Sequence, residues 1–229
     1  MRKLIRLEIK KFKLFSYLKG VAIANIAIMG LLTLMYFVEK SEGIITFDNY
    51  EMAFAAIESI VRPVFIIFAA ALISRLIIDE YKSNSIMLLF MYPISRKRIM
   101  VAKLTIVACF TFLTIVLSNL LIGSVFYLVD SYFHFMPEAL TTEALKDSLA
   151  GMTLGAVASS GIALIPLFLG MRKKSVPATI ISAIILVSLI NSTAGGASLF
   201  SFIATPLALA AIGCLIAYFA FRNIEKVDI

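Results

Sequence analysis

The 229-residue chain is poor in the residue types that build metal, redox and catalytic centres. It has two cysteines, one histidine and no tryptophan, and only 15% of its residues are charged. Cys109 and Cys214 fall inside long apolar runs, as small packing residues do, and His134 has no second histidine with which to hold a metal. No glycine is followed by lysine, so the chain lacks a phosphate-binding loop of the type G-x-x-x-x-G-K-[ST]. We therefore expect neither an enzyme nor a nucleotide-binding subunit.

Apolar residues, by contrast, make up 61% of the chain, more than a soluble core of this length would bury. A helix needs about 20 predominantly apolar residues to span a bilayer. One long run, 175–221, is broken by the turn-forming residues NSTAGG at 191–196. We predict an all-α membrane protein, a single domain over residues 1–229. Its six transmembrane helices are expected at about 20–38, 53–78, 104–129, 149–171, 176–190 and 201–221.

The basic residues predict the orientation of these helices. Lys and Arg collect on the cytoplasmic side of short loops. With six spans, the N-terminus, residues 75–103, residues 172–174 and the C-terminus share one side and hold 18 of the 21 Lys and Arg. We therefore place both termini in the cytoplasm. The net charge of +7 follows mostly from this asymmetry and needs no nucleic-acid partner.

Residues 1–19 are expected to form an amphipathic helix that precedes the first span. Leu4, Ile5 and Ile9 fall on one broad face and Arg2 and Lys3 on the other. Such a helix lies in the headgroup plane, with its cations near anionic lipid. The alternative, a signal peptide, would need an unusually long basic region, and no small-residue cleavage pattern follows the apolar run.

A short apolar segment, Ser85 to Tyr92, stands between the second and third predicted spans. Eight residues make about 12 Å of helix, too short to cross a bilayer. Ser85 is a capping residue type and Pro93 marks a helix end, so we predict a short helix over 85–92. It is either a docking element for a cytoplasmic protein or an interfacial or re-entrant helix without a partner.

The residues around this segment resemble the first cytoplasmic loop of ABC-2 type permeases, the membrane subunits of a class of ABC transporters. The resemblance lies in Glu80, Asn84, Ser85, Leu89, Pro93, Ile94, Ser95, Arg96, Ile99 and Lys103. The family pattern has glycine and threonine where this chain has Asn84 and Ser85. Asn tolerates a left-handed backbone and Ser caps a helix, so both replacements preserve the local geometry.

The resemblance implies six spans, cytoplasmic termini, an N-terminal amphipathic helix and a location in the bacterial plasma membrane. It also implies that 85–92 is a coupling helix, which docks into a separate ABC ATPase subunit that binds ATP and magnesium. This chain itself would hold no cofactor or metal, and a second six-span permease, identical or related, would complete the pathway. The docking residues expected from the resemblance are Glu80, Asn84, Ser85, Leu88, Leu89, Tyr92, Pro93, Ser95 and Arg96.

Two charged residues inside the second span form a second candidate site. Glu58 and Arg62 are spaced i and i+4, so they can pair on one helix face. Ionisable residues within a span are costly and commonly functional. Two interpretations stay open: Arg62 extends to the outer headgroups with Glu58 beside it, or the pair faces the subunit interface or the substrate path.

The sequence favours an exporter of amphipathic peptides or lipid-associated antimicrobials, because the outer loops are short and the spans strongly apolar. The alternative is a membrane adaptor or sensor that binds a cytoplasmic partner through the same helix and transports nothing.

Overall fold

The computed structural model describes residues 2–12, 16–41, 49–82, 96–133, 141–194, 197–198 and 204–222. In chain order, the elements are α1 (Arg2–Lys11), α2 (Tyr17–Ser41), α3 (Tyr50–Ile73), the π-helical turn η2 (Ser74–Ile78), α4 (Asp79–Lys82), α6 (Arg96–Phe133), α7 (Thr142–Ile162), α8 (Pro166–Lys173), α9 (Val176–Asn191), β1 (Thr193–Ala194), β2 (Ala197–Ser198) and α10 (Ala204–Arg222). The two short strands pair antiparallel between α9 and α10. The described residues are otherwise almost entirely helical, which confirms the all-α prediction.

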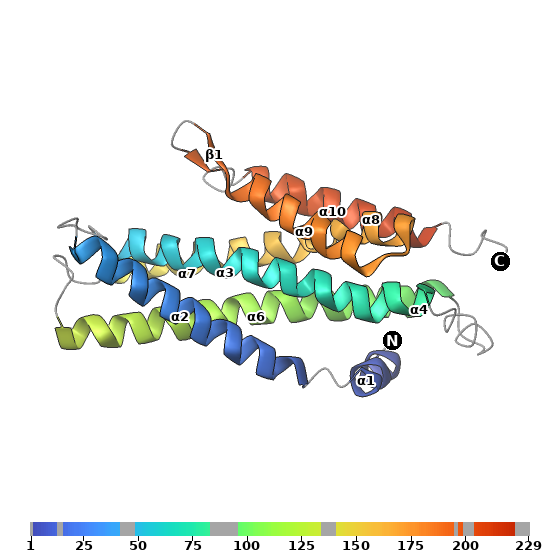
Figure 1. Cartoon of the computed structure of the whole chain (residues 1–229), viewed down its shortest axis with the longest axis horizontal. Coiled ribbons are helices and arrows are strands. Elements are labelled where there is room, and N and C mark those ends of the chain that lie inside the picture. Colours follow the sequence, from blue (N-terminus) through green and yellow to red (C-terminus); the bar gives the residue numbers. More distant parts are fainter. Residues whose placement is uncertain are drawn as a thin grey trace.

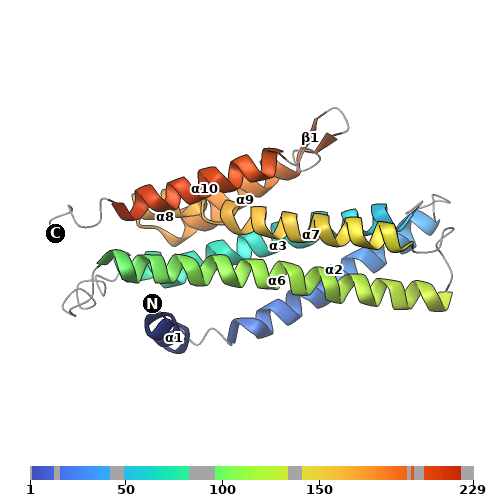
Figure 2. The ribbon, with the colours of Figure 1, turned by 180° about the vertical axis from the view of Figure 1, so that it is seen from behind.

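The helices form an elongated bundle with one crosswise helix at its end. The long helices α3, α6 and α7 run side by side, and α8, α9 and α10 cover one flank (Figures 1 and 2). On another flank, α2 crosses α3 and α6 obliquely. Figure 1 shows α1 nearly end-on, so this helix lies across the bundle at the end that holds α4 and the start of α6.

Four helical stretches are long and apolar enough to cross a membrane. They are Tyr17–Met35, Tyr50–Lys82, Lys97–Tyr132 and Thr142–Lys173, and two shorter apolar helices cover Val176–Asn191 and Thr205–Ala220. Many large apolar side chains on these helices face outward, as hydrocarbon contact requires. The chain is an integral membrane protein. The count of six spans and the cytoplasmic position of both termini stay predictions.

The helix ends follow local sequence signals. The Thr141 side chain accepts a hydrogen bond from the Ala144 N–H, so α7 begins seven residues before the predicted start of the fourth span. The same stretch is interrupted by turn residues 163–165 before Pro166, whose ring nitrogen cannot donate to the helical ladder. The predicted coupling helix at 85–92 lies outside the described residues.

Buried polar contacts join α3, with its extension η2 and α4, to α6 near both ends. At one end the Tyr50 hydroxyl donates to the Asp130 carboxylate. At the other end the Lys103 ammonium donates to the Glu80 carboxylate. Between them, apolar side chains including Ile57 of α3 fill the interface. Because both carboxylates are buried, these contacts set the register of the two antiparallel helices.

Two glycines let α7 and α10 approach until their backbones touch. A Cβ atom on Gly213 of α10 would collide with the carbonyl oxygen of Gly161 on α7. A Cβ on Gly161 would in turn lie 2.9 Å from the Cα of Ala210. Backbone atoms cannot move aside as a flexible side chain can, so both positions require glycine.

We predict that Gly213→Ala separates α7 from α10 and destabilises the fold by about 1–3 kcal/mol, the usual effect of overpacking. Gly30→Ala on α2 is the matched control, because a Cβ there meets nothing within 4 Å. Thermal unfolding in detergent micelles measures both variants. Equal melting temperatures for Gly213→Ala and wild type would contradict the observed packing.

Candidate functional site

The structure describes the two flanks of the predicted docking segment. Glu80 lies on α4, and Arg96 is the first residue of α6, with its side chain outside the described part. The other predicted docking residues, Asn84, Ser85, Leu88, Leu89, Tyr92, Pro93 and Ser95, lie outside the described residues. Their role in docking stays a prediction. The contacts described below are those of the helices on either side of this segment, α4 and α6.

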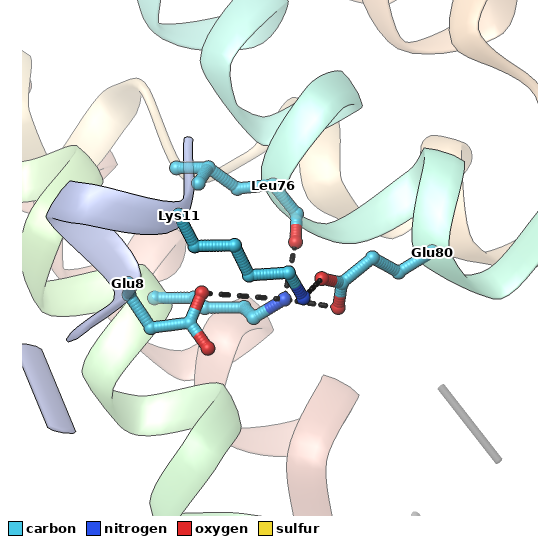
Figure 3. Close-up of polar contacts among 5 residues, drawn as sticks. Glu8, Lys11, Leu76 and Glu80 are labelled. Carbon is cyan, nitrogen blue, oxygen red and sulfur yellow. Dashed lines mark hydrogen bonds and ion pairs between the residues drawn. The ribbon is translucent and has the colours of Figure 1, made fainter. Parts of the chain in front are cut away.

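Glu80 pairs with two ammonium groups that come from different helices. Its Oε1 atom lies 2.6 Å from Lys11 Nζ of α1, and its Oε2 atom accepts from Lys103 of α6 (Figure 3). Glu80 and Lys103 are buried, with 6% and 2% of their surface exposed. A buried carboxylate is stable only when paired and hydrogen-bonded. Glu80 therefore holds α4, α6 and the crosswise helix α1 together.

Lys103 makes further contacts with the neighbouring elements. Its Nζ donates to the Leu76 carbonyl of the π-helical turn at 2.6 Å and lies 3.9 Å from Glu8 Oε2 of α1. The same atom lies 5.2 Å from the centroid of the Phe12 ring, a cation–π distance. The sequence pattern included Lys103 without assigning it a role. The pairing of Lys103 with Glu80 could have been predicted from the sequence, because a lysine just inside one apolar run follows an acidic residue at the end of the preceding span.

The apolar face of α1 packs on the base of the bundle. Ile5, Ile9 and Phe12 lie against the buried cluster that includes Leu76 and Leu104. Glu8, on the same helix, is also buried. Its Oε2 atom accepts no hydrogen bond from the described residues. Burial raises the pKa of the Glu8 carboxyl above its ordinary value of 4.5. Glu80 adds to the increase, and the charges of Lys103 and Lys11 oppose it.

The second candidate pair forms within α3. Arg62 Nη2 lies 2.5 Å from Glu58 Oε1, and Arg62 Nε donates to the same oxygen at 3.0 Å. The side chains are only 11% (Glu58) and 15% (Arg62) exposed. A Cβ on Gly155 of α7 would collide with Glu58 Oε1 and lie 3.2 Å from Arg62 Nε. The pair is therefore packed against α7, in a space left open by a glycine that the sequence did not link to it.

Comparison with known proteins identifies the family. A family model described as ABC-2 family transporter protein matches residues 4–189, which run from α1 through most of α9. The chain belongs to the ABC-2 transporter family. It is also similar to the uncharacterized protein YcbO of Bacillus subtilis (strain 168), with 45% identity over 225 residues, 98% of this chain and 99% of that protein. No solved structure matches.

Membership of the ABC-2 family indicates what kind of subunit this chain is. ABC-2 permeases are membrane subunits that are not themselves catalytic, and the family implies a cytoplasmic ABC ATPase as partner. The matched region contains Glu80, Lys103 and the whole of 83–95. The charged group around Lys103 therefore flanks the loop that resembles the ABC-2 docking loop.

We predict that Arg62→Leu destabilises the protein by about 3 kcal/mol, because it leaves Glu58 buried without its counter-charge. The double variant Glu58→Gln/Arg62→Leu should recover most of this loss, since no uncompensated charge remains. Unfolding in detergent measures stability, and a transport assay with the ABC ATPase should show lost transport in both variants. Normal transport by the stable double variant would show that the pair has only a structural role.

A second prediction concerns pH. Because the folded-state pKa of Glu8 is raised, its contribution to α1 docking is fully present below 4.5 and is lost as pH rises through the raised pKa. Hydrogen exchange of the α1 amides, corrected for intrinsic rates, should therefore show less protection at about pH 7 than at about pH 5. Comparison with Glu8→Gln isolates this effect from Lys11, Glu80 and Lys103. The same pH dependence in both proteins would assign it to another group.

Proposed function

We propose that this chain is the permease subunit of an ATP-driven ABC-2 exporter and that residues 85–92 are its coupling helix. The family match over 4–189 carries the proposal. The buried Glu80–Lys103 pair supports it, because it joins the two helices from which 83–95 extends. A segment with firmly held flanks passes an applied movement to the spans, whereas loosely held flanks would absorb it.

ATP binding draws two ATPase subunits together, and each ATPase moves the coupling helix seated in it. That movement enters the bundle through α4 and α6. A second permease subunit, identical or related, completes the pathway. The cargo is an amphipathic peptide or a lipid-associated antimicrobial, in keeping with the short outer loops and apolar spans.

The adaptor or sensor alternative uses the same docking helix and differs in its outcome. In proteoliposomes that contain permease and ATPase, the exporter moves an amphipathic peptide in an ATP-dependent manner. An adaptor keeps the ATPase bound and moves none. The Glu58–Arg62 pair favours the exporter, because a protein that only docks a cytoplasmic partner has no need of a buried ion pair on α3.

We predict that Leu88→Asp/Leu89→Asp abolishes retention of the ABC ATPase, since two carboxylates would have to enter an apolar contact. Leu145→Asp in the first turn of α7 is the control, because Leu145 is exposed and far in sequence from the loop. Affinity purification followed by quantification of bound ATPase is the measurement. Full ATPase retention by the double variant would remove residues 85–92 from the docking surface.

A further inference from the structure

Lys103 contacts three other elements of the described structure. Its ammonium contacts η2 through the Leu76 carbonyl, α4 through Glu80, and α1 through Glu8, and it also lies near the ring of Phe12, the residue that follows α1. Figure 3 shows the two carboxylates on opposite sides of the ammonium groups. An ammonium group has three donors in a compact head, so one side chain can hold these elements at the same time.

The burial of this group makes its contacts interdependent. The Lys103 side chain is only 3% exposed, so loss of a partner would leave a buried ammonium incompletely hydrogen-bonded, which is costly. If α4 moves, the ammonium must move with the Glu80 carboxylate or remain partly unpaired. Either result changes the contacts of Lys103 with Glu8 on α1 and with Phe12 directly after it.

The π-helical turn adds a mechanical reason for this coupling. η2 connects α3 to α4, and the N–H of Asp79 donates to the Ser74 carbonyl five residues earlier. π-helical turns are rare insertions that often occur at functional sites. Here Lys103 binds a carbonyl within the turn. The contact therefore acts where a movement of α4 would enter α3.

We propose that Lys103 is a positioning residue that couples the crosswise helix α1 to α4 and α6, the two helices that flank residues 83–95. α1 and the docking loop then change state together, and α1 is part of the response to the ATPase. The tie between the helices is a property of this chain alone. Its use during transport rests on the proposed function.

The test has one measurement on the chain alone and one with the ATPase. In lipid nanodiscs, Lys103→Met should speed hydrogen exchange of the amides of both α1 and α4 by about tenfold, within the usual range of coupling between sites. Lys19→Met is the control, because Lys19 is exposed on α2. With the ATPase, Lys103→Met should retain binding but lose about tenfold in transport per ATP hydrolysed.

A second variant guards against simple misfolding. Glu80→Gln/Lys103→Met removes both charges of the closest pair, so the Glu80 carboxylate is not left without Lys103, and the variant should fold while keeping the faster exchange in α1. Unchanged exchange of α1 in this variant, or unchanged transport per ATP in Lys103→Met, would overturn the proposal. If the wild-type chain retains no ATPase, the proposed function fails, whereas the exchange measurement still decides whether Lys103 ties α1 to α4.

Discussion

A lysine ammonium enclosed by apolar side chains keeps its charge only if oxygen atoms surround it, and at Lys103 these oxygens come from different elements. The Glu80 carboxylate fixes α4 beside α6, and the Leu76 carbonyl fixes the π-helical turn. Glu80 also accepts from Lys11, which brings α1 across the bundle. The Glu80 carboxylate, shared by Lys103 and Lys11, therefore holds α4 beside α6 and helps to hold α1 across the bundle.

The helices of the chain were largely predictable because membrane spans depend on local apolar runs. The helix expected from Val176 to about 190 is α9, which ends at Asn191 where turn-forming residues begin. The interruption at 163–165 was not predicted, although Pro166 was a usable signal. The π-helical turn at Ser74–Ile78 had no local signal, because one of its carbonyls is bound by a side chain 27 residues away.

The candidate site shows the same division between local and distant contacts. The pairing of Glu58 with Arg62 follows from their i, i+4 spacing, whereas the contact with Gly155 required the placement of α7. Glu80 was expected only at the edge of the docking segment. Its pairing with Lys11 joins residues 69 positions apart, and no periodicity in one sequence relates two such positions. Charge pairs across helices therefore emerged only from the fold.

The two charged groups are placed so that α3 and its extension can connect them. Glu58 and Glu80 are separated by 22 positions along the continuous stretch Tyr50–Lys82, or about 33 Å at 1.5 Å per residue, close to the thickness of a hydrocarbon core. Each group balances its formal charges, Glu58 with Arg62, and Glu8 and Glu80 with Lys11 and Lys103. Glu58 and Arg62 lie on the same helix, so a shift of α3 along its axis would carry this pair as a neutral unit, whereas Glu80 would move relative to its partners Lys11 on α1 and Lys103 on α6. An axial movement of α3 is therefore opposed most strongly at the Glu80 end, where it would separate a buried carboxylate from the lysines of two other helices.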